Sequence, residues 1–392
     1  MLEGLKILSF THYLQGPSAA QTLADMGADV VKVESPKGAF ERHWSGCHTY
    51  LNGVSVFFLL ANRNQRALSI DLKSPDGVKI IHDLIGTFDI VIENFKPGVM
   101  EKLGLDYESL RKVNPKLIYC SCSGHGSEGP RARMPGQDML AQAVSGFAAQ
   151  NGSGDRPPAA VSGSPIDQHA AIWAAFGILS AAYSRNRTGE GCKVDCCLLN
   201  AAMDLQMEPF IYWMNGGHLT DRATTGLSSR IHQSPYGVYR TQDYFIAISL
   251  TPFEKLIAAF GEEALKGWKA EDQMSRRHEF DRVMAAEILK RPTAEWKKLF
   301  DELGIWNAPV NDYPQVLEDE QVKYNEIVTE IDHPVAGKVK LVNHANRYNG
   351  KPPAIRRLPP ELGEHSGEVL RECGYDDAKV AEMLNKGVIA GK

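Results

Sequence analysis

The chain has 392 residues, of which 43% are hydrophobic and 23% charged, so it can bury a sizeable core and is long enough for two domains. Its net charge of −5 excludes the basic surface that nucleic acid or an anionic membrane would require. The N-terminal stretch lacks the apolar run of a signal peptide, and the longest apolar stretch, residues 170–183, is too short to span a bilayer. The seven cysteines form no CxxC pair, which favours buried thiols over structural zinc. We therefore expect a cytoplasmic protein with no metal, no membrane partner and no nucleic-acid partner.

The first 130 residues alternate between apolar strands and amphipathic helices. We predict strands within residues 4–10, 28–34, 88–94 and 115–124, and helices over 18–26 and 78–85. This alternation is typical of βαβ units around a parallel sheet. Ligands of such sheets bind beyond the carboxyl ends of the strands, so the loops at 11–17, 93–98 and 123–130 are the candidate binding loops.

The second half of the chain has a different texture. A helix follows Asp167 through Ser184, residues 192–199 form a strand or a strand-to-helix junction, and a further helix extends through Tyr212. Residues 237–250 alternate like a β-hairpin, and charged helices follow it. We predict a separate α+β domain over residues 225–335, a proline-rich return segment near Leu358 and C-terminal helices.

One glycine motif suggests a nucleotide site but lacks the context for it. Residues 124–129 read GHGSEG and follow a strand, as in a dinucleotide fingerprint. Pro130 and Pro135 prevent the helix that the fingerprint needs directly afterwards. We interpret the motif as a flexible glycine loop that lets backbone approach a ligand.

Three polar residues near the predicted strand ends could carry chemistry. His125 and Asp167 could form an acid–base pair, although the sequence does not show that they meet. Gln15, on a loop before a helix, could donate an amide hydrogen to an oxyanion. Asp167 precedes an apolar helix, where an aspartate either caps the helix or serves as a carboxylate nucleophile beside the helix dipole.

The chain resembles the class III CoA-transferases over nearly its whole length. The resemblance rests on the order and spacing of several segments, among them GPSAAQTLADMGADVVKVESPKG, DIVIENFKPGVMEKLGLDYESL, PGQDMLAQAVSG, SGSPIDQHAA and LGEHSGEVLRECGY. It implies an α/β fold in which a large Rossmann-like parallel-sheet domain accompanies a smaller α+β domain. The large domain would comprise residues 1–200 and 336–392, with 201–224 as a linker helix region. It also implies an interlocked ring homodimer.

The resemblance assigns Asp167 as the nucleophile that forms aspartyl anhydride and aspartyl-CoA thioester intermediates. The positions that it implies for CoA are Arg42, Asn94, Phe95, Lys102 and the loop residue His125. CoA thioester is then a substrate, and no tightly bound cofactor is expected.

Two departures affect the remaining site residues. The glutamine that helps to hold the oxyanion in the formyl-CoA transferases of the family aligns with Leu14, so Gln15, one place later, becomes the candidate. The related α-methylacyl-CoA racemases have their catalytic histidine where this chain has Gln137. The oxyanion donor is therefore Gln15, Gln137 or backbone.

The resulting hypothesis is an acyl-CoA:carboxylate CoA-transferase whose acceptor is a small dicarboxylic or hydroxycarboxylic acid such as succinate, oxalate or itaconate. The bases Arg42, His43 and His48 favour such acids. A racemase or epimerase that uses Asp167 with a histidine is the alternative, and a non-catalytic acyl-CoA-binding protein is a third.

Overall fold

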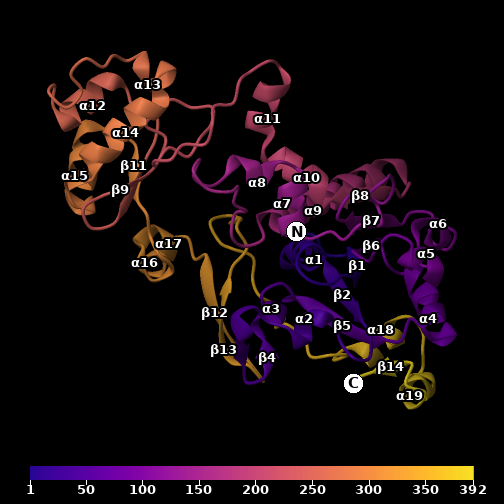
Figure 1. Cartoon of the computed structure of the whole chain (residues 1–392). Helices are drawn as coiled ribbons and strands as arrows, with labels where there is room; N and C mark the ends of the chain where they lie inside the picture. The colour runs from indigo at the N-terminus through magenta and orange to yellow at the C-terminus, as the bar shows by residue number, and fades with distance from the viewer. Residues whose placement is uncertain (392) are drawn as a thin grey trace. The chain divides into compact units, whose positions relative to one another are not determined.

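A computed structural model describes residues 1–391 and divides the chain into two compact units (Figure 1). Unit 1 comprises Met1–Ala141, Ser164–Leu205 and the chain from Gln321 onward, so it draws on both ends of the sequence. Unit 2 comprises Gln142–Gly163 and Gln206–Glu320.

Unit 1 is built on a seven-stranded sheet with the strand order β14-β5-β2-β1-β6-β7-β8. The strands are β1 (Lys6–Phe10), β2 (Asp29–Glu34), β5 (Gln65–Ile70), β6 (Ile90–Glu93), β7 (Ile118–Ser123), β8 (Lys193–Cys197) and β14 (Ile389–Ala390). Six strands run parallel, and only β14 is antiparallel to its neighbour β5. The predicted parallel sheet is confirmed, as are the four strands expected in the first 130 residues.

Helices cover both faces of this sheet, which explains why its central strands are continuous apolar runs. On one face, α4 (Pro75–Ile85), α18 (Ser366–Glu372) and α19 (Asp377–Asn385) share a core with alternate strand residues such as Leu8 and Val31. On the other, α1 (Gln15–Asp25) packs against α9 (Pro165–Thr188). In Figure 1 the C-terminal helices α18 and α19, in yellow, lie beside the sheet formed by the N-terminal strands.

Shorter elements complete the first unit and its junctions. They are α2 (Phe40–His43), η1 (Gly46–His48), β3 (Tyr50–Leu51), β4 (Val54–Ser55), α3 (Val56–Leu59), α5 (Val99–Leu103), α6 (Tyr107–Leu110), α7 (Asp138–Val144), α10 (Leu198–Leu205), α17 (Glu320–Tyr324), β12 (Val328–His333) and β13 (Gly337–Val342).

Unit 2 has its own small sheet and its own core. Its antiparallel sheet has the order β11-β10-β9, and the predicted hairpin at 237–250 is confirmed by the pairing of β9 with β10. Buried aromatic side chains such as Phe280, Trp296 and Phe300 fill the core. The elements are α8 (Phe147–Gln150), α11 (Met207–Met214), β9 (Gly237–Arg240), β10 (Phe245–Ile248), α12 (Phe253–Phe260), α13 (Asp272–Ser275), α14 (Arg277–Ile288), α15 (Thr293–Leu303), β11 (Asn307–Pro309) and α16 (Tyr313–Glu318).

Three features differ from the sequence-based expectation. Residues 142–163, expected in the large domain, belong to unit 2, and residues 321–335, expected in the smaller domain, belong to unit 1. The helix expected to continue through Tyr212 is interrupted at Gln206, whose backbone is not helical, giving α10 and α11. Strand β5 was not predicted, although all six of its residues are buried. No helix within residues 1–391 has the length and apolar character needed to cross a membrane.

Candidate active site

The strand order reverses its direction between β1 and β6, which is where open parallel sheets bind their ligands. The loops after these two strands are tied together. The His12 N–H donates to Asn94 Oδ1 at 2.8 Å, and Asn94 Nδ2 donates back to the His12 carbonyl oxygen at 2.7 Å. The rings of His12 and Phe95 lie 5.2 Å apart. The predicted CoA residues Asn94 and Phe95 therefore lie together at the switch point, with the Asn94 amide engaged in joining the two loops.

A buried ion pair holds the loop that follows β1. Lys32 and Glu41 are both fully buried, and Lys32 Nζ lies 2.9 Å from Glu41 Oε1 and 2.9 Å from the Thr11 carbonyl oxygen. The other Glu41 oxygen accepts the Tyr13 N–H at 3.3 Å, where Tyr13 has a left-handed φ of 63°. Burial raises the pKa of Glu41, but Lys32 and His12 outweigh it and lower the value to about 2. The Lys32–Glu41 ion pair thus fixes the conformation of the loop that leads into α1.

Gln15 lies at the N-terminal end of α1 and is buried. Its Nε2 lies 4.0 Å from Cys196 Sγ, a long contact with a weak acceptor. The Cys196 thiol in turn donates to the Ala170 carbonyl oxygen at 3.3 Å. Gln15 is therefore linked to the end of β8 and, through Cys196, to the second turn of α9. Its amide N–H groups have only this weak hydrogen-bond acceptor among the described residues.

Asp167 is the third residue of α9 and does not cap the helix, so the capping interpretation of this residue is wrong. Asp138, the first residue of α7, supplies the acceptor instead. Its Oδ2 receives the N–H of Ile166 at 2.6 Å and the N–H of Asp167 at 3.0 Å. The helix start is therefore capped by a side chain from 28 residues earlier in the chain.

The Asp167 carboxylate is half-buried, and no group within residues 1–391 donates a hydrogen bond to it or pairs with it as a cation. Burial, together with the negative charge of Asp138, raises the pKa of Asp167 to about 7. A carboxylate with a perturbed pKa that takes part in no ion pair is a candidate for function rather than for stability.

A contact between two glycines brings Asp138 to α9. Gly124 follows β7, and a Cβ added to it would lie 2.4 Å from the Cα of Gly136. The glycine loop thus approaches backbone of the same chain at Gly136, and its expected approach to a ligand stays a prediction. Gln137, which follows Gly136, is exposed. Only glycine at 124 and 136 permits this contact, so the two glycines position the start of α7.

The histidines near Asp167 in the sequence or at the loops bond to other groups. His125 Nε2 lies 3.3 Å from the Pro135 carbonyl oxygen. His169 Nε2 lies 2.8 Å from Asp204 Oδ2. No hydrogen bond or ion pair within the described chain joins His125 to Asp167, so the expected acid–base pair is not formed.

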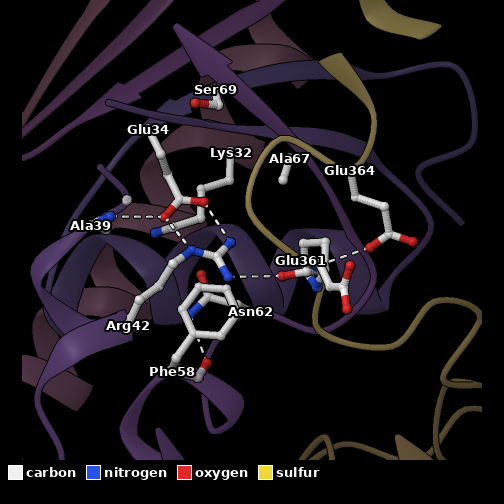
Figure 2. A network of polar contacts seen from close by, with 12 residues as sticks. Lys32, Glu34, Ala39, Arg42, Phe58, Asn62, Ala67, Ser69, Glu361 and Glu364 are labelled. Atoms are coloured by element: carbon white, nitrogen blue, oxygen red, sulfur yellow. Dashed lines mark hydrogen bonds and ion pairs between the residues drawn. The ribbon is translucent and has the colours of Figure 1, made fainter. Parts of the chain in front are cut away.

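Arg42 lies in a structural network that Figure 2 shows. Its Nε and Nη2 bond both oxygens of the buried Glu34 at 2.7 and 2.6 Å, Nη1 donates to the Pro360 carbonyl oxygen at 3.0 Å, and the guanidinium lies 3.8 Å from the centre of the Phe58 ring. Burial opposes ionisation of Glu34, but Arg42 holds the pKa of that carboxyl below its ordinary value. Most of the binding capacity of Arg42 is therefore used inside the protein, whereas Lys102 is exposed on α5.

Sequence reasoning did not single out Glu93, at the carboxyl end of β6. It is buried, accepts the Ser121 hydroxyl, and accepts the Phe95 N–H at 2.9 Å. Burial raises the pKa of Glu93 to about 7 in spite of these hydrogen bonds. The sequence does carry a signal for Glu93, because it is an ionisable residue at the end of an apolar strand. Glu93 holds the backbone of the Phe95 loop.

Comparisons with known proteins place this geometry in a family. Residues 2–366 match the sequence profile of CoA-transferase family III. The succinyl-CoA:glutarate CoA-transferase of Mus musculus is 31% identical over 99% of this chain and 90% of its own length. The succinyl-CoA–D-citramalate CoA-transferase of Chloroflexus aurantiacus is 31% identical over 99% of this chain and 98% of its own length.

A solved structure agrees with these matches. The crystal structure of a CAIB/BAIF family protein from Brucella suis superposes with a TM-score of 0.83 at 28% identity, covering 95% of this chain and 99% of that one. The resemblance read from the sequence motifs is confirmed. The chain belongs to CoA-transferase family III and is a CoA-transferase.

Proposed function

We propose that this enzyme moves CoA from an acyl-CoA thioester to a small dicarboxylic or hydroxycarboxylic acid, with the Asp167 carboxylate as the nucleophile. The observation that carries the proposal is the state of Asp167, which is half-buried, has no hydrogen-bond donor among residues 1–391 and has a raised pKa. The named relatives transfer CoA to glutarate and D-citramalate, which supports an acceptor of that class.

The reaction needs no water and no net proton transfer. The Asp167 carboxylate attacks the thioester carbonyl, the C–S bond breaks, and CoA leaves as a thiolate with a mixed anhydride on the enzyme. The thiolate attacks the aspartyl carbonyl, which releases the donor acid and leaves an aspartyl-CoA thioester. The acceptor carboxylate attacks that thioester, and the freed thiolate then takes the acyl group from the new anhydride, which restores Asp167. Covalent catalysis of this kind divides one difficult transfer into easier steps.

The oxyanions of these steps require hydrogen-bond donors. The first turn of α9 offers few, because the N–H groups of Ile166 and Asp167 already donate to Asp138. We therefore assign the oxyanion to the Gln15 amide, whose only partner among the described residues is a distant thiol, with the exposed Gln137 as the second donor. This revises the expectation that backbone at the helix start would provide the donors.

We assign CoA to the loops at the switch point. Asn94 and Phe95 would border it, the exposed ammonium of Lys102 would meet a phosphate, and His125 would lie along the loop after β7. Arg42 remains in the proposal as a residue that shapes this region through Glu34. CoA acts as a substrate here, and the proposal includes no tightly bound cofactor.

We also propose that two copies form an interlocked homodimer in the cytoplasm. Large apolar side chains remain exposed along α9, including Ile172, Trp173, Phe176 (59% exposed) and Tyr183 (69% exposed). An apolar stripe of this kind on one helix is typical of a surface that another chain covers. All seven cysteines are unpaired, in keeping with a reducing compartment.

The nucleophile is tested by trapping. The enzyme is mixed with an acyl-CoA donor without acceptor and quenched with hydroxylamine, and its peptides are analysed by mass spectrometry. We expect a hydroxamate at Asp167 that depends on the donor, while Asp138 serves as an internal control that stays unmodified. An enzyme that transfers CoA while Asp167 remains unlabelled would contradict the mechanism. A matrix of CoA donors against carboxylic acceptors then identifies the substrates.

A further inference from the structure

Unit 2 contains a cavity of about 280 Å³ between two segments of its chain, residues 150–153 and 222–230. The described residues that line it include two arginines, Arg222 and Arg230, four hydroxyl side chains, and neither aspartate nor glutamate. The acids nearest to the lining in the sequence, Asp155 and Asp221, are both exposed, and Asp155 accepts the Ser153 hydroxyl. The cavity is thus lined by positive charge and by neutral hydrogen-bonding groups.

No aspartate or glutamate within residues 1–391 forms an ion pair with Arg222 or Arg230. Arg222 donates to the carbonyl oxygens of Asn151 and Arg156, each at 2.9 Å. Arg230 donates to the Thr220 carbonyl oxygen at 2.6 Å and to Gln150 Oε1 at 3.2 Å. Every one of these acceptors is neutral, and each guanidinium has five N–H donors, of which the bonds use only two. Both side chains are therefore held in place while donors and charge remain available for an anion.

A third arginine lies behind the same loop. Arg277, the first residue of α14, is only 3% exposed, and its Nη2 donates to the carbonyl oxygen of Ser229, a lining residue. Its Nε and Nη1 are buried without a hydrogen-bond partner. A buried guanidinium with unmatched donors is unfavourable by itself. The charge of Asp281, four residues further along α14, offsets part of this cost, and a bound anion would offset more of it.

The loop that forms the cavity wall is rigidly held. Asp281, fully buried in α14, accepts hydrogen bonds from the Thr225 hydroxyl, from the Leu227 N–H at 3.2 Å, from Ser234 Oγ at 2.9 Å and from the Tyr239 hydroxyl at 2.6 Å. These four bonds occupy both carboxylate oxygens. Asp281 therefore organises the wall, and a ligand meets a pocket formed in advance, which reduces the entropy lost on binding.

We propose that this pocket binds a carboxylate group of a small dicarboxylic acid, through Arg222 and Arg230. Guanidinium groups match the planar carboxylate with paired hydrogen bonds. The volume lies just below the range of about 300–1,000 Å³ found for larger ligands, which suits an acid of four or five carbons better than a nucleotide. The role of the pocket in selecting dicarboxylates as acceptors rests on the proposed CoA transfer. The binding of a dicarboxylate to the pocket does not depend on it.

Direct binding tests the pocket without relying on catalysis. The full chain is titrated calorimetrically with succinate, with butyrate, which has the same chain length but one carboxylate, and with adenosine 3′,5′-bisphosphate. We expect succinate to bind at least tenfold more tightly than butyrate. Arg230→Gln and Arg222→Gln should each weaken the binding of succinate about 10- to 100-fold, because a charge-assisted hydrogen bond is lost. Butyrate and the nucleotide should bind these variants as they bind the wild type.

Two variants complete the design. Arg282→Gln changes an exposed arginine of α14 and should leave succinate binding unchanged. Arg230→Lys keeps the charge without the planar fork and should give an intermediate affinity, and thermal unfolding shows that each variant is folded. Equal succinate affinity in wild type and Arg230→Gln would overturn the proposal. Loss of adenosine 3′,5′-bisphosphate binding in that variant would also overturn the proposal, because the pocket would then bind a CoA phosphate. Arg230-dependent succinate binding in a protein without transferase activity would refute only the proposed function.

Discussion

Replacing Asp167 with asparagine should abolish CoA transfer and make the fold more stable. Asparagine is nearly isosteric with aspartate but carries no charge and is a poor nucleophile. The wild-type carboxylate lies half-buried beside Asp138, and these two causes raise its pKa from 3.8 to about 7. Stability and activity therefore oppose each other at this residue.

The magnitude follows from the two pKa values. Below about pH 4 the carboxyl is protonated in both the folded and the unfolded chain, so it has no effect on the free energy of unfolding. As pH rises from about 4 to 7, the unfolded chain loses this proton while the folded chain retains it, so the folded state loses stability. Above pH 7 the penalty is constant, at most about 4 kcal/mol at 1.36 kcal/mol per pKa unit. Contact of the carboxylate with water reduces this to roughly 1–2 kcal/mol.

Urea unfolding of wild type and Asp167→Asn at pH 5 and pH 8 measures the effect. The variant should be the more stable protein at both pH values, and its advantage should be larger at pH 8 by about 1 kcal/mol. Asp106→Asn is the matched control, because hydrogen bonds from Ser109 outweigh burial and hold the pKa of Asp106 below its ordinary value. That control should gain no stability at pH 8. If Asp167→Asn gains no more stability at pH 8 than the control does, the surroundings of Asp167 do not destabilise its ionised carboxylate.

Three further predictions concern the residues around the site. Asp138→Ala should cost about 1–2 kcal/mol of stability by removing the cap of α9, and should shift the acidic limb of the pH dependence of kcat/KM to lower pH, because one cause of the raised pKa of Asp167 is gone. Arg42→Met should lower the free energy of unfolding by about 3 kcal/mol, since Glu34 is left buried and unpaired; a higher KM for acyl-CoA with unchanged stability would instead assign Arg42 to CoA. Glu41→Gln should cost about 3–5 kcal/mol at pH 7 by leaving Lys32 unpaired, and the loss should shrink as pH falls through 4.5 towards 2, where wild-type Glu41 also takes up its proton.

The parallel sheet could be predicted because its strands are apolar runs, and β5 shows where that signal ends. Its sequence QRALSI reads as polar, yet Arg66 is only 2% exposed. Asp29, Glu368 and Glu372 neutralise it at 2.6–2.8 Å. Two of these partners lie about 300 residues away in the chain, so no local pattern reveals that this strand can be buried.

In the candidate site, too, some features follow from local sequence and others from contacts between distant residues. The loops that follow β1 and β6 could be predicted, because ligands of parallel sheets bind beyond the carboxyl ends of the strands. The partners of the polar side chains could not. Arg42 looks like a surface base in the sequence, and only the fold brings its guanidinium to Glu34 and Pro360. His125 also resembled an acid–base group, but its Nε2 lies next to the Pro135 carbonyl oxygen.

The start of α9 explains how the proposed nucleophile, an aspartate in the first turn of a helix, has a raised pKa. An aspartate there normally gains from the helix dipole and from nearby N–H groups, which lower its pKa and weaken it as a nucleophile. In this chain the Asp138 carboxylate takes the N–H groups of Ile166 and Asp167 with a single oxygen. Asp138 thereby stabilises the helix, withholds those donors from Asp167 and places a negative charge beside it. Because all three effects come from one side chain, the helix start is satisfied by hydrogen bonds while the carboxylate within it stays basic and unpaired.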